Sequence, residues 1–440
     1  MDDTAKELAI RQAAFALLAG SVDLAWRLAA TFLAAAVPIY VAHWMNWSSL
    51  HETLDVLLGL NFLIGATVLA IVLVWVVRPK PSRTAHSETY NAADRFLHAL
   101  AFSGPGMLRG VARLDDRLFA ATLLKTQSPR SVFITSLARG GTTAVLNALD
   151  AVPQTVTYHY RDMPFITAPL MWSKMTSLRG RSIMPVERAH GDGLSIDLNT
   201  PEAFDEVLWR LFWPEKYTAN QIALWTHEDL KPEATQFFKT QLKKLAHVQT
   251  SSVADACYLS KNNANLARLP LLHEMFPDAH IVVPLRRPAP HAASLLRQHR
   301  NFLDLHERNP FAKRYMRDIG HLEFGALHTP IGFPGFDAAA RDPLHPDYWI
   351  NYWHAAFSWL LEQDIPYRLI VQDNLRCDAE QTMQELCKDL GLYGGQIAFA
   401  PFFRTKPDRD PQDTFSPDAL GKANDVYQRL IRKQMNEGLG

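Results

Sequence analysis

The chain has 440 residues, and its 45 Lys and Arg balance its 45 Asp and Glu, so the formal net charge is zero. This length suits one large domain with an appended segment. The lack of a basic excess argues against nucleic acid as a partner, since its phosphates attract proteins through Lys and Arg. Cys257, Cys377 and Cys387 are too few and too widely spaced for a metal site. They predict reduced thiols in a reducing compartment.

The first 80 residues are more apolar than the rest and predict a membrane anchor. Residues 56–77 form a run of 22 residues without a charge, enough to cross a bilayer core of about 30 Å at about 1.5 Å per residue. Residues 28–45 form a weaker run that contains Pro38 and His43. A signal peptide is the competing interpretation, but the apolar run begins late and has no evident cleavage site. We therefore expect a transmembrane helical hairpin over residues 1–80.

The distribution of basic residues predicts on which side of the membrane the ends of this hairpin lie. The loop at residues 46–55 has no Lys or Arg, whereas five basic residues flank the two runs: Arg11, Arg27, Arg78, Lys80 and Arg83. The positive-inside rule then predicts an integral protein of the inner or plasma membrane, with both ends and the large domain cytoplasmic. In the alternative, the first run lies along the interface, a single span remains, and the large domain is outside.

Residues 81–127 predict a juxtamembrane helical linker. This interval is polar at first and then weakly helical, and four arginines stand beside its apolar residues: Arg95, Arg109, Arg113 and Arg117. Anionic headgroups would attract them. A solvated helical face explains them equally well.

Residues 131–149, SVFITSLARGGTTAVLNAL, combine a predicted strand, a glycine turn and a helix start. Such a unit aims backbone N–H groups and the positive end of the helix dipole at its ligand, which suits a phosphate or sulfate group. Gly140 and Gly141 let the backbone approach closely, and Arg139 adds a permanent charge. Thr142 and Thr143 add hydroxyl donors. The alternatives are an ordinary turn with glycines for packing, or an NTPase P-loop, which would need the missing GxxxxGK[ST] pattern.

Short apolar runs alternate with helical patterns from residue 128 to residue 440. Strands are expected at residues 132–134, 155–158, 256–259, 280–285 and 367–371. Helices are expected, among others, at residues 142–149, 234–248, 266–275, 347–361 and 380–390. This alternation predicts an α/β fold with a doubly wound parallel sheet, which binds its ligand at the carboxyl ends of the strands.

A second site signal is HIVVPLRRPAPHAAS at residues 280–294. Arg286 follows a predicted strand, and Pro288 or Pro290 opens a helix that carries Ser294. An arginine and a hydroxyl placed in this way hold a phosphate by charge-assisted hydrogen bonds. The adjacent Arg287 leaves open an ordinary solvated pair of arginines.

Both signals match one known family. The first loop, RGGTT, resembles the RSGTT or KSGTT loop of sulfotransferases that use 3'-phosphoadenosine 5'-phosphosulfate (PAPS), with Gly140 in place of the usual serine. The second is similar to the family's 3'-phosphate element, because Ser294 follows Arg286 by eight residues. The segments KNNANLARL and QDNLRCDAEQTMQELCKDLGL also look like family elements, so the resemblance covers most of residues 128–440. It implies a PAPS-dependent sulfotransferase domain that releases 3'-phosphoadenosine 5'-phosphate (PAP) and needs no metal.

The resemblance also implies roles for single residues. The 5'-phosphosulfate group would lie against Arg139, Gly140, Gly141, Thr142 and Thr143, and the 3'-phosphate against Arg286 and Ser294. Lys261 resembles the catalytic lysine, although a surface lysine is the alternative. Arg404 and Lys406 loosely match a basic loop over the 3'-phosphate.

The general base is implied less directly. Cytosolic relatives have a histidine two residues after the lysine, where this chain has Asn263. Tyrosylprotein-type relatives use a carboxylate about twenty residues after the loop arginine, which implies Asp162, 23 residues after Arg139. Asp162 could instead belong to an ion pair or a helix start. The further candidates are His159, Glu187 and His190.

Aromatic residues crowd two stretches, residues 209–225 and 349–359. At helical spacing such residues usually form core. If some line a pocket beside a membrane, they predict a hydroxyl acceptor that is a lipid, a membrane-associated glycan or a peptide tyrosine. Two other functions remain open: a phosphotransferase that uses Mg²⁺ and ATP, and a membrane-tethered scaffold that binds a nucleotide without turnover.

Overall fold

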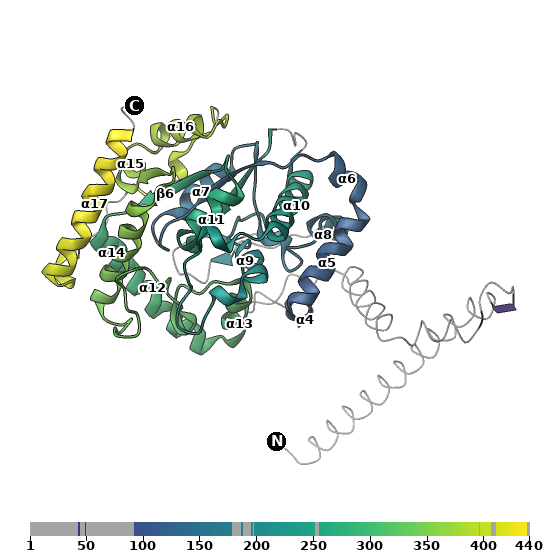
Figure 1. Ribbon diagram of the computed structural model, residues 1–440, viewed down its shortest axis with the longest axis horizontal. Helices are drawn as coiled ribbons and strands as arrows, with labels where there is room; N and C mark the ends of the chain where they lie inside the picture. Colours follow the sequence, from purple (N-terminus) through teal and green to yellow (C-terminus); the bar gives the residue numbers. More distant parts are fainter. Residues whose placement is uncertain are drawn as a thin grey trace, which may run out of the picture. The chain divides into compact units, whose positions relative to one another are not determined.

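The computed structural model describes residues 43–44, 49, 92–177, 186–187, 195–196, 198–250, 255–395, 397–405 and 411–437. The chain separates into two units, Met1–Arg83 and Thr84–Gly440. Apart from His43 and Trp44, both predicted membrane spans lie outside the described residues. Within these ranges, no helix has the length and apolar character that crossing a membrane requires. The strands and helices discussed below all belong to the second unit (Figure 1).

Five parallel strands form the main sheet of this unit. They are β1 (Arg130–Ile134), β2 (Thr155–Val156), β5 (Cys257–Lys261), β6 (His280–Leu285) and β7 (Arg368–Val371), in the order β2-β5-β1-β6-β7. The five predicted strands are therefore confirmed, with ends within two residues of those expected. In the central strand, Ile134 pairs with Lys261 on one side and with Val282 on the other. The carboxyl ends of β1, β5 and β6 thus meet at one edge of the sheet.

Helices and a small hairpin surround this sheet. The hairpin pairs β3 (Val186–Glu187) antiparallel with β4 (Ser195–Ile196). The described α-helices are α4 (Ala92–Ala101), α5 (Pro105–Leu118), α6 (Ala120–Lys125), α7 (Thr142–Asp150), α8 (Pro169–Ser177), α9 (Glu206–Phe212), α10 (Pro232–Gln249), α11 (Leu269–Met275), α12 (Pro288–Arg308), α13 (Pro310–Ile319), α14 (Pro346–Glu362), α15 (Gln372–Cys377), α16 (Ala379–Asp389) and α17 (Pro417–Glu437).

Most of the predicted helices are confirmed, with one difference. The segments expected at 142–149, 234–248, 347–361 and 380–390 correspond to α7, α10, α14 and α16. The one expected at 266–275 divides into a 3-10 turn, Asn263–Arg268, and α11. Pro270 lacks an N–H and fixes its φ angle, so a continuous helix cannot run through it. Pro288 opens α12, as expected, because proline at the first helical position loses no hydrogen bond.

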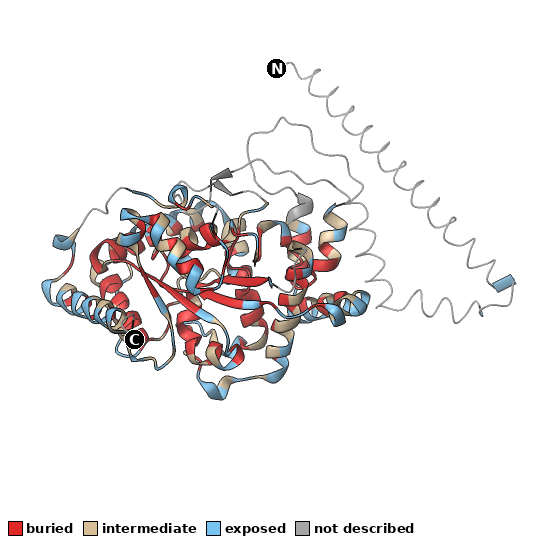
Figure 2. Ribbon diagram, turned by 90° about the horizontal axis from the view of Figure 1, so that it is seen from above, coloured by how far each residue is buried: buried red, intermediate tan, exposed pale blue. Residues whose placement is uncertain are grey.

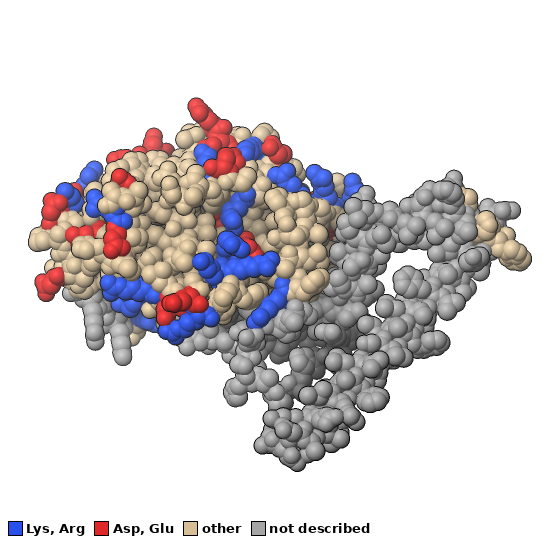
Figure 3. All heavy atoms as spheres, turned by 90° about the horizontal axis from the view of Figure 1, so that it is seen from below, with Lys and Arg blue, Asp and Glu red and all other residues tan. Residues whose placement is uncertain are grey.

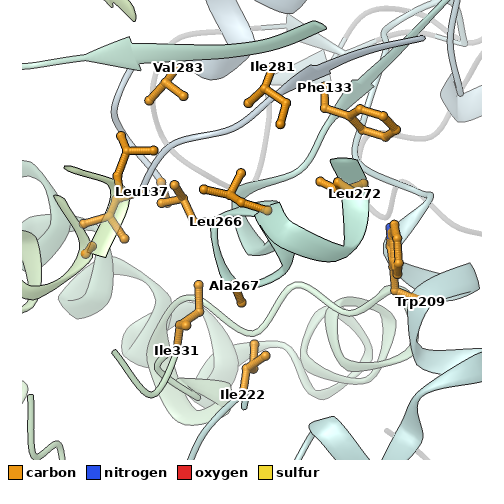
Figure 4. Packing of buried hydrophobic residues seen from close by; sticks show 14 of the residues in the cluster. Phe133, Leu137, Trp209, Ile222, Leu266, Ala267, Leu272, Ile281, Val283 and Ile331 are labelled. Carbon is orange, nitrogen blue, oxygen red and sulfur yellow. The ribbon is translucent and has the colours of Figure 1, made fainter. Parts of the chain in front are cut away.

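The two faces of the sheet bury different residues of each strand. Val132 and Ile134 pack on the side of α7 and α16, with Leu146 and Met383. Phe133 points to the opposite face, into a larger cluster that includes residues of α9, α11 and α14 (Figure 4). Figure 2 shows the buried strands between the helices of the two faces. Apolar residues therefore cover both faces of the strands, as a parallel sheet requires.

Helices α4 to α6 fall in the interval predicted to be a linker. They belong to the second unit and pack on its other helices. Lys244 of α10 is fully buried and forms ion pairs with Asp115 (3.2 Å) and Asp116 (2.7 Å) of α5. The Thr167 hydroxyl donates to the carbonyl of Leu108. These contacts fix α5 against α8 and α10.

Charges are mixed on the surface of the second unit. Figure 3 shows acidic groups among the Lys and Arg side chains that gather on one face. Several exposed pairs join neighbouring turns of a helix, for example Arg308 with Asp304 and Lys422 with Asp418. Such exposed pairs contribute at most about 1 kcal/mol each, so the fold depends on its buried contacts.

Candidate functional site

The site begins at the turn between β1 and α7. Arg139 has a left-handed backbone with φ of 67°, and Gly141 is left-handed with φ of 102°. Arginine in this region costs roughly 1 to 2 kcal/mol, so the surroundings must hold the turn in place. The turn carries the chain directly into Thr142, the first residue of α7. The first N–H groups of a helix have no partner within the helix, so α7 presents donors at the carboxyl edge of the sheet.

Gly140 is required by packing. A Cβ atom at this position would lie 2.6 Å from Ser136 Oγ and 2.9 Å from the carbonyl oxygen of Leu137. Contacts this short force neighbouring atoms to move, and one of them belongs to the backbone. The departure from the usual serine therefore has a local cause: Ser136 fills the space that a side chain at position 140 would need.

Two side chains that follow β6, one just before α12 and one in its first turn, hold carbonyl groups of this turn. Arg286 is 9% exposed, and its Nη1 donates to the carbonyl of Arg139 at 3.1 Å. His291 Nδ1 accepts from the Trp353 indole N–H, so its Nε2 carries the proton and donates to the carbonyl of Ala138 at 2.8 Å. The loop after β1 and the helix after β6 are thus joined by hydrogen bonds.

The two predicted anion elements also meet through their side chains. Arg139 Nε donates to Ser294 Oγ at 3.3 Å. Ser294 lies on α12, 155 residues away in sequence. The structure therefore brings Arg139, Arg286 and Ser294 together with the N-terminus of α7, where cationic and neutral donors converge.

Lys261 lies at the end of β5 and is 6% exposed, so the surface-lysine alternative is wrong. Its Nζ is 2.9 Å from Oε1 of Glu202, whose side chain is fully buried. The backbone N–H of Glu202 donates to the carbonyl of Tyr158, which fixes the segment beside β2. The carboxylate of Glu202 therefore compensates the buried positive charge of Lys261.

Asn263 connects the turn to a second carboxylate. Its Oδ1 accepts from the Thr142 hydroxyl at 3.3 Å, and its Nδ2 donates to Glu323 Oε1 at 2.8 Å. Glu323 lies between α13 and the 3-10 turn at Gly325–Leu327. Gly320 and Gly325 on either side of it are left-handed, with φ of 84° and 66°. Only glycine enters this region freely, so these two residues shape the bend that carries Glu323.

Two cavities meet at this point. We call the first the loop cavity; its polar lining includes Arg139, Thr142, Thr143, Lys261, Asn263 and Glu323. We call the second the apolar cavity; its lining includes Leu137, Ile222, Leu295, Ile331, Trp349 and Tyr352. Five residues line both: Ala138, Asn263, His321, Glu323 and Phe324. A polar space suited to an anion therefore adjoins an apolar one.

Comparison with known families decides the class of protein. Residues 129–323 match the model of a family described as the sulfotransferase family. This match supports a sulfotransferase family for residues 129–323 of the chain. The match covers the turn between β1 and α7, which we call the anion turn (residues 135–141), as well as Lys261, Arg286 and Ser294. It ends at Glu323.

Solved structures with a similar course of the chain are bacterial sulfotransferases. Sulfotransferase STF9 of Mycobacterium avium has 13% identity and a TM-score of 0.43, and 78% of this chain and 86% of that chain are covered. STF1 of Mycobacterium tuberculosis has 12% identity and a TM-score of 0.39, with 83% and 91% covered. A sulfotransferase of Alicyclobacillus acidocaldarius has 13% identity and a TM-score of 0.33, with 70% and 96% covered. A comparison with curated protein sequences gives no match.

Asp162 lines neither of the two cavities. It is 4% exposed, and its Oδ2 accepts the backbone N–H of His159 at 2.8 Å, which caps the 3-10 turn Tyr160–Asp162. Burial raises the pKa of its carboxyl group. His159 Nε2 is 3.2 Å from Asp150 Oδ2. Neither residue lines the loop cavity, and the contacts of Asp162 match the helix-start alternative.

The sequence also singles out five other residues: Glu187, His190, Arg287, Arg404 and Lys406. Glu187 belongs to β3, and nothing is described of its side chain, while His190 and Lys406 lie outside the described residues. Arg404 is exposed. Arg287 forms an ion pair with Asp373 at 3.1 Å, so its side chain has a different partner from that of Arg286.

The two predicted aromatic stretches are mostly core. Trp209, Trp213 and Trp225 are fully buried, whereas Trp349 and Tyr352 line the apolar cavity. Sequence reasoning did not single out Glu202 or Glu323. Glu323 had one available signal, a His-x-Glu segment between two glycines, but nothing in it indicates which distant residues it contacts.

A buried polar network supports the end of β5. Asp205 accepts hydrogen bonds from the Ser260 hydroxyl and from Asn262 Nδ2. Glu206 pairs with Arg268 at 2.9 Å, and the Arg268 guanidinium lies over the ring of Trp209. Burial raises the pKa of Asp205 to about 6, although the hydrogen bond from Ser260 opposes this.

We predict that Gly140→Ser, which gives the loop the sequence RSGTT, destabilises the protein. The added side chain collides with Ser136 Oγ and the Leu137 carbonyl, and overpacking of this kind costs about 1 to 3 kcal/mol. Chemical denaturation of the two proteins measures the effect. Gly395→Ser is the control, since a Cβ there meets no atom within 4 Å. Equal stability of Gly140→Ser and the wild type would contradict the packing argument.

We also predict a pH-dependent contribution from Asp205. The folded state holds a proton on this carboxyl group up to about pH 6, above its ordinary pKa of 3.8. The stability that it contributes is therefore fully present below about pH 4 and is lost as the pH rises through about 6. Two pKa units correspond to about 3 kcal/mol. The unfolding free energy of the wild type should therefore decrease, relative to that of Asp205→Asn, as the pH rises from 4 to 7. A difference between the two proteins that stays constant over this range would contradict the raised pKa of Asp205.

Proposed function

We propose that the protein transfers a sulfuryl group from PAPS to the hydroxyl group of an amphiphilic acceptor. The match of residues 129–323 to the sulfotransferase family supports sulfuryl transfer in general. The observation that carries the choice of PAPS is the contact between the two anion elements. Arg286 donates to the carbonyl of Arg139, whose side chain in turn donates to Ser294. A donor with phosphate groups at both the 5' and the 3' positions would use this pair of elements together, and ATP would leave the second one without a ligand.

In this proposal the turn and the first turn of α7 bind the phosphosulfate end. The N–H groups at the start of α7, the Thr143 hydroxyl and the Arg139 guanidinium stabilise anionic oxygens. Arg286 and Ser294 bind the 3'-phosphate. These fixed donors orient the sulfur toward the acceptor before the reaction, which lowers the entropic part of the barrier.

Lys261 stabilises the leaving group. As the bond between sulfur and the bridging oxygen breaks, negative charge grows on that oxygen, and a fixed ammonium group stabilises it more in the transition state than in the ground state. Glu202 compensates the buried charge of Lys261 and restricts its side chain.

The acceptor occupies the apolar cavity. Its wall of Leu, Ile, Trp and Tyr side chains favours a hydrocarbon or aromatic body, while the hydroxyl group lies toward the loop cavity. A lipid, or a glycan carried on a lipid, fits this chemistry and the apolar run at residues 56–77. We therefore also propose that the first 80 residues anchor the enzyme in the inner or plasma membrane, with the catalytic unit on the cytoplasmic side.

The donor is tested with the purified full-length protein in detergent. PAP should raise the melting temperature more than ADP or Mg-ATP at equal concentration, because a ligand that binds only the folded state stabilises it. A shift with Mg-ATP alone would favour a phosphotransferase. If no nucleotide shifts a protein whose folding has been verified, the site does not bind PAPS.

We predict that Arg286→Ala weakens PAP binding by about 10-fold to 100-fold, since a charge-assisted hydrogen bond contributes about 1.5 to 3 kcal/mol. AMP, which has no 3'-phosphate, should lose less affinity than PAP, and the part that it does lose reflects the hydrogen bond by which Arg286 holds the carbonyl of Arg139. Titration calorimetry with both nucleotides measures the difference. Arg287→Ala is the matched control, because that arginine pairs with Asp373. Equal losses of PAP and AMP affinity would place Arg286 outside the 3'-phosphate site.

We predict that the full-length protein stays in the membrane pellet after an alkaline carbonate wash. Such a wash strips proteins that bind by charge alone and leaves spans of about 20 apolar residues inserted. Release into the supernatant would contradict the anchor and would leave the catalytic proposal intact.

A further inference from the structure

Glu323 occupies the junction between the two cavities. It lines both of them, whereas Glu206, the other carboxylate that lines the apolar cavity, is paired with Arg268. Lys261 lines the loop cavity close by. A carboxylate in this place faces the region where a donor in one cavity and an acceptor in the other would meet.

The amide of Asn263 fixes the position of this carboxylate. Thr142 donates its hydroxyl proton to Asn263 Oδ1, so the other end of the amide, Nδ2, is aimed at Glu323 Oε1, 2.8 Å away. An ionised carboxylate is an acceptor only, so it matches this N–H. Thr142 is the first residue of α7. The carboxylate is therefore held at a fixed position relative to the anion turn.

The backbone of Glu323 is held as well. His328 Nδ1 donates to the Glu323 carbonyl at 2.6 Å, and His328 Nε2 accepts from the Tyr348 hydroxyl at 2.7 Å. Burial lowers the pKa of His328 to about 3, so this imidazole is neutral and does not neutralise the nearby carboxylate. Hydrogen bonds therefore hold both the side chain and the backbone of Glu323. A group that reacts with one particular atom has to be fixed in this way.

We propose that Glu323 is the general base of the sulfuryl transfer and that Asn263 is its positioning residue; this proposal rests on the function proposed above. Glu323 accepts the proton of the acceptor hydroxyl while the acceptor oxygen forms its bond to sulfur. The bond between sulfur and the bridging oxygen breaks, and its electron pair leaves on PAP next to Lys261. The proton on Glu323 then passes to solvent, so no oxidant or metal takes part.

The other buried carboxylates near the site have different contacts. Glu202 is fully buried against Lys261 and lines neither cavity. Asp162 caps a 3-10 turn through the N–H of His159. His321 also lines both cavities, and it is the alternative proton acceptor that an experiment must separate from Glu323.

The walls of the apolar cavity indicate the acceptor class. Leu137, Ile222 and Ile331 come from three separate segments of the chain and appear in Figure 4 near one another around Leu266 and Ala267. An alcohol with a long apolar body buries that body here and presents its hydroxyl group to Glu323. An alcohol is not ionised near neutral pH, so its attack depends on a base.

The test compares two acceptors that differ in their need for a base. 1-Octanol keeps its proton at neutral pH, whereas 4-nitrophenol ionises near neutral pH and attacks without help. Glu323→Gln in the full-length protein should lower kcat with 1-octanol by about 100-fold to 10,000-fold, the usual contribution of a general base. With 4-nitrophenol the loss should be less than about 10-fold, the melting temperature and PAP affinity should be unchanged, and Glu307→Gln, at an exposed position of α12, should behave as the wild type.

Other results would contradict this assignment. Equal losses with both acceptors would make Glu323 structural, and loss of octanol transfer in His321→Asn but not in Glu323→Gln would make the histidine the base. Transfer by the wild type to neither probe, although PAP binds, would overturn the apolar acceptor. Absence of PAP binding would instead overturn the proposed function, so the two failures are distinguishable.

A second variant tests the positioning role. Asn263→Ala removes the hydrogen bond that favours the ionised carboxylate, so the acid side of the pH–rate profile with 1-octanol should move to higher pH. A variant that merely loosens the fold would lower the rate at all pH values and leave the profile in place. That outcome would contradict the role of Asn263.

Discussion

The hydrogen bonds from Arg286, which follows β6, and from His291 of α12 to the turn after β1 are the interaction on which the site depends. A left-handed arginine and a glycine-only position make this turn unfavourable by itself. His291 and Arg286 each donate to one of its carbonyl groups, and Trp353 fixes the tautomer of His291. The turn therefore takes its shape only when β6 and α12 have docked beside β1. Arg286 has two uses in consequence, since it stabilises the turn and carries the positive charge that a phosphate would need.

A second constraint is the set of buried charges around the end of β5. Lys261 pairs with Glu202 and Arg268 pairs with Glu206, while Asp205 accepts from Ser260 and Asn262. Removing one partner of a buried pair costs about 3 to 5 kcal/mol, because a charge remains without compensation. The network thus holds the side chain of Lys261 at the edge of the loop cavity.

The two cavities separate two chemical tasks. The loop cavity is polar and cationic, whereas the apolar cavity offers hydrocarbon and aromatic surface. Their common boundary contains Asn263 and Glu323, and a hydrogen bond joins these two residues. An acceptor that fills the apolar side would exclude water from the boundary, and electrostatic interactions strengthen where water is excluded. The same arrangement would limit transfer of the sulfuryl group to water.

The sequence by itself determined the parallel sheet and the strand, glycine turn and helix start at residues 131–149, because periodicity and glycines are local properties of the chain. It did not identify Glu202 or Glu323. These residues reach Lys261 and Asn263 across 59 and 60 positions, and no local pattern records which carboxylate a strand end will face. Spacing alone favoured Asp162, whose carboxylate instead accepts the N–H of His159 three residues away. Only the tertiary structure decided which carboxylates meet the lysine and the asparagine, because burial leaves a charged group stable only beside a partner, and that partner is set by how the elements pack.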